Sequence, residues 1–462
     1  MVSTKSNIYQ KYAPVWKKCR DVISGSRLVK EAGETYLPRP SGMEKEEYDK
    51  GYKTRAEFCD FTGRTFHGYK GLAFAKPMIK TVPEEFMGYL ENVDGEGTNL
   101  DDFAYNVFQD CIKTNWGGIL VDAPSSSGLS INEAEKLGLY PYMTYYPAEA
   151  IINVQFETVN RNKVLKMVVL QETKNVPLPD DKFTTQPQIN YRVLELVDGV
   201  YAQSIYNKNE ELIDTIVPLK QGKPMDYIPF FFTPQNEPTE PMLESLCDVN
   251  LAWYRKSADL ENGAHWTGVP TPYSLGHTYN KDQDGVIKLG GTQFVYFPAD
   301  VTHVDYLEFS GSGLSVLNKL LLDDQDRMAL LGARIIATEK KGVESSETAR
   351  IHKAGEDSVL ATFCNRVSNT LTRALKDYLE WTVGYEITED VFVHINTDYD
   401  LTDMDAGRLT ALISAWQTGG ISKQTLFNNL KKGEIIDSDK SFEEEQSEID
   451  ETGIAIPTLD AE

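Results

Sequence analysis

Cysteine and histidine are scarce in this 462-residue sequence, and neither residue forms a metal-binding pattern. The five cysteines stand far apart, their number is odd, and no CxxC pair occurs. The six histidines include no HExxH motif and no close pair. This pattern argues against a disulfide framework and a zinc site, and it favours reduced thiols in a cytosolic setting. The cysteines are Cys19, Cys59, Cys111, Cys247 and Cys364.

Long hydrophobic runs are also absent. The longest, around Val164 to Leu170, has the length of a strand, whereas a membrane-spanning helix needs about 20 apolar residues. Residues 1–20 lack the apolar core of a signal peptide. We therefore expect a protein that is made and used in the cytoplasm, or in an assembly built there.

Positive charge is in the minority, because 46 basic residues face 70 acidic ones and the net charge is -24. An ordinary DNA-binding domain needs a basic face to displace counterions from phosphate, so that class is not favoured. Solubility is the simplest role for the acidic excess. An acidic protein can nevertheless contact DNA where the DNA has to slide past it without being held tightly.

Catalytic motifs are weak or missing. No GxxxxGK[ST] loop accompanies the strand-like segment 117–122, so Asp122 is expected to end a buried strand and not to hold magnesium. The acids from Asp398 to Asp405 do not form an EF-hand, since Asp403 occupies the position of its glycine. Ser125 to Gly128 is not a GxSxG motif. We expect no catalytic residue, no metal and no cofactor.

The first 240 residues alternate between helical and strand patterns. We expect helices over Ser6 to about Arg20, Tyr48 to Gly63, and Leu100 to about Lys113, the last capped by Thr98 or Asn99. Phe66 to Pro77 is expected to be a short strand. Further strands are expected at 117–122, 151–157, 163–171, 191–197, 200–206 and 213–219. The Asp198-Gly199 pair is a strong hairpin signal, because both positions favour a positive φ.

The rest of the chain changes to long helices. We expect a helix over about 241–266, a β-type stretch over 267–309, a helix over 314–336 and a longer helix to about residue 382. The first of these carries Asn250 and Ser257 on its packing stripe and meets a break at Gly268 to Pro272. A strand over 386–396, two short helices (403–418 and 422–432) and a disordered acidic tail from residue 437 complete the prediction.

Several segments resemble a branch of tailed-bacteriophage portal proteins that is often catalogued as a domain of unknown function. The resemblance runs, with gaps, from about residue 8 to residue 380. Its segments are WKKCRDVISG (16–25), YLPRP (36–40), YKTRAE (52–57), NLAWYR (250–255), SAD (257–259) and GVPTP (268–272).

The resemblance implies the α+β portal fold, with a wing, a two-helix stem, a small β-containing clip, a long helix after a tunnel loop, and a helical crown. The implied divisions are wing 1–240, first stem helix 241–267, clip 268–310, second stem helix 311–336, tunnel loop 337–346, long wing helix and returning strand 347–400, crown 401–436 and acidic tail 437–462.

The resemblance also implies a function. Portal proteins form a ring of about twelve copies at one capsid vertex, assembled in the cytoplasm of the bacterial host. Double-stranded viral DNA is packaged, retained and ejected through the channel of this ring. The implied partners are the terminase large subunit, a head–tail adaptor and the major capsid protein. The resemblance implies no enzymatic activity, no cofactor and no contact with a membrane.

Two groups of residues are implied to matter for this function. The tunnel loop would bring Lys340 and Lys341, with flexible Gly342, near DNA phosphates, while Glu339 and Glu344 limit sticking. Arg350 and Lys353 are weaker candidates for the channel. The junction between stem and clip would consist of Trp266, Gly268, Pro270 and Pro272.

Two other functions stay open. A minor capsid or head–tail adaptor protein would bridge other proteins without a DNA channel. A cytosolic metal-dependent hydrolase would use the acidic segment that includes Asp398 and Asp403.

Overall fold

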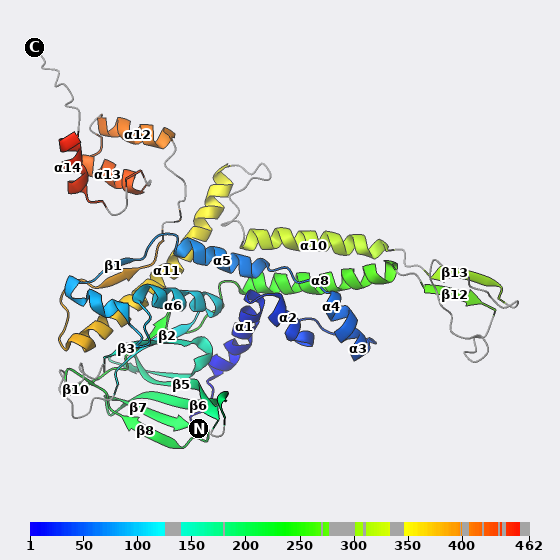
Figure 1. Ribbon diagram of the computed structural model, residues 1–462, viewed down its shortest axis with the longest axis horizontal. Helices are drawn as coiled ribbons and strands as arrows, with labels where there is room; N and C mark the ends of the chain where they lie inside the picture. Colours follow the sequence, from blue (N-terminus) through cyan, green and yellow to red (C-terminus); the bar gives the residue numbers. More distant parts are fainter. Residues whose placement is uncertain are drawn as a thin grey trace, which may run out of the picture. The chain divides into compact units, whose positions relative to one another are not determined.

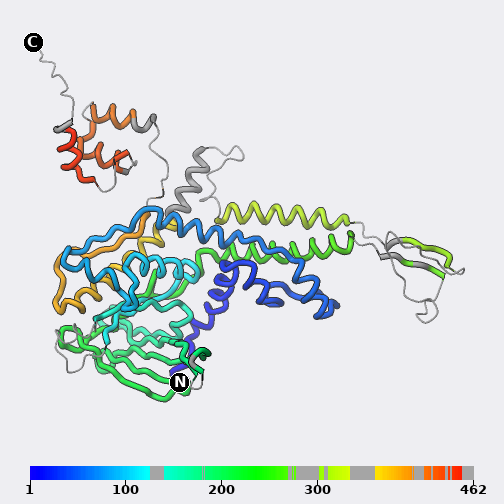
Figure 2. The backbone as a smooth tube through the Cα atoms, in the orientation of Figure 1, coloured from blue at the N-terminus to red at the C-terminus, as the bar shows by residue number. Residues whose placement is uncertain are grey.

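The computed structural model of the protein contains both helices and sheets, as expected for the α+β class (Figures 1 and 2). The chain divides into two compact units, Met1–Thr397 and Asp398–Glu462. The described residues are 1–124, 140–178, 181–268, 271–276, 301–307, 311–332, 346–397, 399, 406–417, 420–432, 435–436 and 440–452.

The first unit begins with the predicted helix α1 (Asn7–Ile23), which Ser6 caps by accepting a hydrogen bond from the Tyr9 N–H. It buries Trp16 and Cys19 completely. Short helical pieces follow: α2 (Ser26–Glu31), η1 (Gly33–Thr35), α3 (Lys45–Glu47), η2 (Tyr48–Tyr52) and α4 (Lys53–Arg55).

Two predictions in this region are wrong. The helix expected over 48–63 is interrupted at Ala56, whose ψ of 127° leaves the helical region. The strand expected at Phe66 to Pro77 is instead largely in helix α5 (Phe61–Ala73), capped by Asp60. Phe66 and Tyr69 are buried and lie three residues apart, so they share one helical face. Their aromatic side chains had favoured a strand.

Helix α6 (Leu100–Thr114) begins as predicted, because the Asn99 side chain accepts a hydrogen bond from the Asp102 N–H. Asp101 and Asp102 lie in the first turn, where the helix dipole favours negative charge. The helix ends at Asn115, which adopts the left-handed conformation with φ of 54°. β1 (Ile79–Thr81) and the 3-10 helix η3 (Glu84–Glu91) precede it.

A three-stranded sheet forms the centre of the unit, in the order β11 (Phe230–Thr233), β2 (Gly117–Asp122), β3 (Tyr142–Pro147). All six residues of β2 are buried. Gly118 is required where β2 passes β11, because a Cβ atom there would overlap the Phe230 ring. Asp122 ends this buried strand, as the sequence predicts.

A five-stranded antiparallel sheet follows the order of the chain. Its strands are β4 (Ile151–Val159), β5 (Asn162–Leu178), β6 (Asp181–Val197), β7 (Val200–Asn207) and β8 (Leu212–Ile216). The Asp198-Gly199 turn has φ values of 51° and 80°, which confirms the predicted hairpin. β5 and β6 have 17 residues each, longer than expected. A small hairpin, β9 (Leu219–Lys220) and β10 (Lys223–Pro224), comes next.

The long helices agree closely with the sequence. α8 (Glu244–Gly268) leads to the hairpin of β12 (Thr271–Leu275) and β13 (His303–Leu307), and α10 (Ser312–Leu331) follows. α11 (Ser346–Val383) buries one apolar stripe, which consists of Leu360, Phe363, Val367, Leu371, Ala374 and Tyr378. The strand expected over 386–396 is shorter, and as β14 (Phe392–His394) it pairs with β1.

The second unit contains α12 (Ala406–Gln417), α13 (Lys423–Lys432) and α14 (Phe442–Thr452). The first two helices were predicted, whereas α14 lies in the segment expected to be a disordered tail. The Ser441 hydroxyl accepts a hydrogen bond from the Glu444 N–H, and the Glu444 carboxylate accepts one from the Ser441 N–H. The Phe442 ring contacts the Phe427 ring of α13 at 5.4 Å between centroids. This capping box and aromatic contact explain why the acidic segment is helical.

Candidate assembly site

The helices α8 and α10 form an antiparallel pair with the β12–β13 hairpin between them in the chain (Figure 1). Contacts at both ends establish the direction. Gly263 lies against Leu314 at one end, and Gly332 lies against Leu246 at the other. A Cβ atom at Gly263 would come within 2.6 Å of a Leu314 methyl carbon, so glycine permits the close approach of the two helices.

A buried ion pair links the middle of the two helices. The Lys256 Nζ of α8 lies 2.5 Å from the Asp324 Oδ2 of α10, and Asp324 is only 2% exposed. Arg327 provides a second, longer contact to the same carboxylate, at 3.4 Å. Because an isolated buried carboxylate is costly, this pair favours one register of α10 along α8.

The polar residues on the packing stripe of α8 contact the same chain. The Asn250 Oδ1 accepts hydrogen bonds from the Thr62 N–H and hydroxyl, and its Nδ2 donates to the Cys59 carbonyl. The Ser257 hydroxyl donates to the Glu57 carbonyl and accepts from the Glu57 N–H. These two side chains therefore hold the segment that leads into α5.

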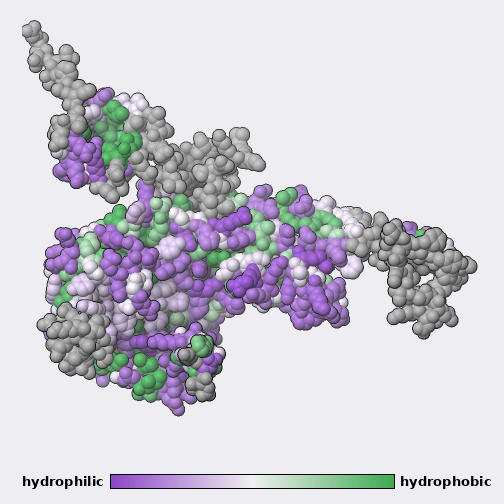
Figure 3. Space-filling model, in the orientation of Figure 1, coloured by the Kyte–Doolittle hydropathy of each residue, from purple (hydrophilic) through white to green (hydrophobic). Residues whose placement is uncertain are grey.

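Apolar residues remain uncovered along one face of α10. Val316, Leu320 and Leu330 are 59%, 40% and 49% exposed, and Leu331 lies beside them. Asp323 and Arg327 lie on the same face between Leu320 and Leu330. Positions 316, 320, 323, 327 and 330 therefore follow one another at intervals of four or three residues. We call Val316, Leu320, Leu330 and Leu331 the α10 stripe; apolar residues of α10 are visible on the surface in Figure 3. This spacing is the one by which helices pack against one another.

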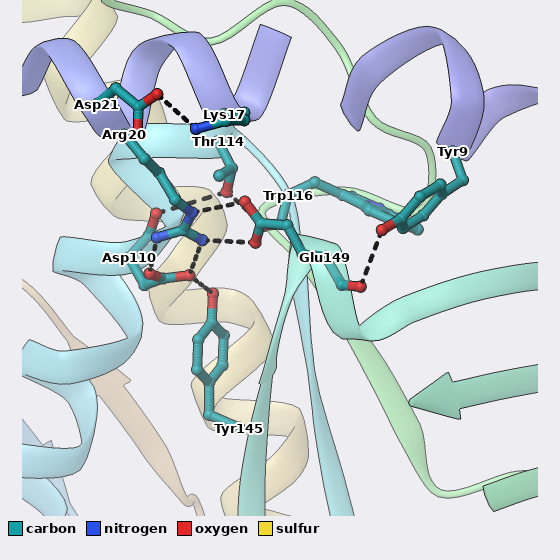
Figure 4. Close-up of polar contacts among 9 residues, drawn as sticks. All are labelled: Tyr9, Lys17, Arg20, Asp21, Asp110, Thr114, Trp116, Tyr145 and Glu149. Atoms are coloured by element: carbon teal, nitrogen blue, oxygen red, sulfur yellow. Dashed lines mark hydrogen bonds and ion pairs between the residues drawn. The ribbon is translucent and has the colours of Figure 1, made fainter. Parts of the chain in front are cut away.

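A second polar network holds α1 in place (Figure 4). The Arg20 guanidinium donates to both carboxylate oxygens of Asp110 on α6 and of Glu149 next to β3. The Tyr145 hydroxyl donates to the same Asp110. Burial opposes the charge of Arg20, but the two carboxylates outweigh it and raise its pKa. No local sequence pattern predicts this network, since its members lie far apart in the chain.

All but the last residue of the predicted tunnel loop (337–346) lie outside the described residues, so Glu339, Lys340, Lys341, Gly342 and Glu344 stay predictions. Arg350 and Lys353 belong to α11, of which only the backbone is described at these positions.

The predicted junction is partly described. α8 ends at Gly268, and β12, which contains Pro272, begins three residues later. Trp266 is 43% exposed, with its ring 5.7 Å from that of His265. Pro270 lies outside the described residues. The structure thus has a helix end and a strand start where the prolines predicted a break.

Within the described ranges, no group of three or more His, Cys, Asp or Glu side chains could hold a metal ion. Asp398, Asp400, Asp403 and Asp405 fall outside those ranges. None of the described helices combines the length and the apolar character that a membrane span requires.

Comparison with known proteins identifies a family match in the helical region. Residues 241–382, which include α8 and α10 and most of α11, match the family described as "Domain of unknown function (DUF4055)". The expected resemblance to a portal-like family catalogued as a domain of unknown function is confirmed over these residues. No curated protein matches the chain.

Two solved structures resemble the chain at 12% sequence identity and a TM-score of 0.39. One is described as "Neck of native GTA particle computed with C12 symmetry"; the match covers 87% of this chain and 98% of that chain. The other is described as "Neck of empty GTA particle computed with C6 symmetry", with 87% and 96% covered.

Proposed function

We propose that this protein is the subunit of a portal ring, a non-enzymatic conduit for double-stranded DNA at one vertex of a phage capsid. In this proposal about twelve copies close a ring by repeating one head-to-tail contact. The terminase motor, a head–tail adaptor and the major capsid protein bind its outer surfaces, and DNA is packaged, retained and ejected through its channel.

The observation that carries the proposal is the uncovered α10 stripe on a helix that its own chain already fixes. The Lys256–Asp324 pair and the close contact at Gly263 hold α10 against α8. Apolar side chains at helical spacing nevertheless stay exposed on the adjoining face. A row of such residues favours contact with another protein surface, and the same helical pair of a neighbouring copy offers a partner of matching length.

The charge of the chain is compatible with a conduit. The net charge of -24 would make most of a channel wall repel phosphate, so DNA could slide. A few lysines would position the duplex without holding it, and Lys340 and Lys341 are the residues we assign to that role.

The DNA-channel assignment predicts a specific effect of reversing charge in the loop. In the Lys340→Glu plus Lys341→Glu variant, we expect rings to form normally but DNA packaging in infected cells to fall, by about tenfold or more if each subunit loses two phosphate contacts. The measurement is the packaged genome content of particles, alongside the ring count in electron micrographs.

The matched control is Lys5→Glu plus Lys208→Glu, which makes the same charge change at two exposed lysines of the first unit. This control should package at the wild-type level. Wild-type packaging by the loop variant would remove the loop from the channel. If rings of the wild-type protein are present in assembled heads but never contain DNA in their channel, the head–tail adaptor function is supported instead.

A further inference from the structure

A groove of about 810 Å³ lies in the first unit, away from the α8–α10 pair. It is lined by β3, by residues 171–174 of β5, by the loop at Asp94 and by the end of β2. Its aromatic lining consists of Tyr140, Tyr142 and Tyr146. A hollow of this size accommodates one or two large side chains of a bound segment.

The floor of the groove is fixed by buried polar contacts. The Arg192 Nε lies 2.7 Å from Glu172, and its Nη1 lies 3.1 Å from Asp122. The Tyr146 hydroxyl donates to the same Glu172, at 2.6 Å. The Gln203 amide donates to Asp122 at 2.8 Å. These contacts orient the floor before any ligand arrives, which lowers the entropic cost of binding.

Negative charge exceeds positive charge along the lining. Five carboxylates line the groove, from Asp94, Glu96, Asp122, Glu149 and Glu172, against the two bases Lys174 and Arg192. Arg192 is shared between two of the carboxylates, and Glu149 is paired with Arg20 from outside the lining. The carboxylates of Asp94 and Glu96 have no ion pair among the described residues.

Asp94 is held in its charged form. Burial opposes its ionisation, but hydrogen bonds from the Thr98 side chain and from the backbone N–H groups of Glu96 and Thr98 outweigh burial and lower its pKa. The groove therefore presents fixed negative charge next to tyrosine rings. Carboxylates and aromatic faces together favour a cation with an apolar stem, such as an arginine or lysine side chain.

We infer that this groove is a docking site for an arginine- or lysine-bearing segment of a partner protein. The inference goes beyond ring formation and does not depend on it, because the groove is built within one unit of one subunit. Charge complementarity and the tyrosine lining select the occupant, and the pre-oriented floor sets where its cationic group lies.

The test uses the full-length protein and a fluorescent peptide of alternating arginine and glycine, with binding followed by fluorescence anisotropy. Since the whole chain is acidic, each variant needs a partner with the same charge change elsewhere. Lys174→Glu removes an exposed base from the groove, and Lys208→Glu makes the same change at the β7–β8 turn. Glu96→Gln with Tyr140→Ala alters the groove at two exposed positions, and Glu443→Gln removes a charge in the second unit.

We expect Lys174→Glu to tighten binding by about threefold and Glu96→Gln with Tyr140→Ala to weaken it by about fivefold. Lys208→Glu and Glu443→Gln should leave the dissociation constant within about 1.5-fold of the wild type, because distant exposed charges are screened by salt. Equal tightening by the two lysine variants would overturn the inference, since it would show attraction to the acidic chain as a whole. Preference for a glutamate-glycine peptide would also overturn it.

Discussion

Single residues of α8 show how much of this fold depends on polar contacts. Asn250 and Ser257 lie on the packing stripe of a long helix, where leucine or alanine would be ordinary. They instead satisfy backbone groups of residues 57–62, about 190–200 positions away in sequence. Sequence periodicity placed both residues on the right face, but it could not show which segment they contact. A contact over such a distance leaves no local pattern.

At Asp324, the structure predicts a large effect of removing one charge. Asp324→Asn would leave the Lys256 ammonium of α8, whose side chain is only 29% exposed, without its counter-charge on α10. We expect a loss of about 1–3 kcal/mol in the free energy of unfolding, below the full cost of breaking a buried pair because Lys256 keeps some solvent. Urea unfolding at neutral pH measures this.

Asp326→Asn is the matched control for this substitution, because it removes the same charge from an exposed position of α10. Its cost should stay within about 0.5 kcal/mol. Equal stability of the two variants would show that the Lys256–Asp324 pair does not fix the helices.

The buried thiol of Cys111 should make the free energy of unfolding depend on pH in the alkaline range. Burial raises the pKa of its thiol to about 12, although hydrogen bonds with Tyr145 and Thr233 counteract this, whereas a thiol in the unfolded chain has a pKa of about 8.5. Between these values the folded state keeps a proton that the unfolded chain has lost. Stability contributed by the neutral thiol is therefore complete below about pH 8.5 and falls as the pH rises toward 12.

The measurement is urea unfolding at pH about 8 and about 10.5. The wild type should lose about 1–2 kcal/mol more between the two values than Cys111→Ala, which has no thiol to titrate. Parallel losses in the two proteins would contradict this account of the thiol.

At the level of elements, regular patterns were predicted well and their interruptions were not. The turn at Asp198-Gly199 and the cap at Asn99 follow from local chemistry, and both are present. The strand expected at Phe66 is a helix because Asp60 caps it and α5 buries its aromatic face. Strand β5 extends beyond its predicted end and β6 begins before its predicted start, because the two strands pair with each other, which the sequence of a single strand does not reveal.

The helix α14 carries a prediction about the second unit. Deleting residues 437–462 should leave the unfolding of Met1–Thr397 unchanged, since α14 belongs to the other unit. It should, however, expose Phe427 of α13, whose ring contacts Phe442. We expect amide hydrogen exchange in α13 to accelerate by about tenfold or more, as for a helix that loses its packing partner.

Phe442→Ala is the companion variant, because it removes the ring contact and retains the chain. It should accelerate exchange in α13 in the same direction. Unchanged protection of α13 in both proteins would show that the aromatic contact does not order this unit. A lower unfolding temperature of the first unit would show that the segment packs on it.

At the scale of the whole molecule, we propose that copies of this chain close a ring. The family match covers the region that contains the α8–α10 pair, and the α10 stripe gives that pair an uncovered apolar face. The sequence predicted the order of helix, β segment and helix, because each element has its own periodicity. It did not predict which face of α10 stays uncovered, since that depends on where α8 packs.

Ring formation is tested by the mass of the purified protein in solution, measured by light scattering, together with negative-stain images of the same sample. We predict particles of about twelve subunits with a central hole. Val316→Glu plus Leu320→Glu should reduce them to monomers that unfold normally, whereas Asp326→Asn should leave the rings intact. A dimer or tetramer without a hole, or rings that persist in the double variant, would contradict the account.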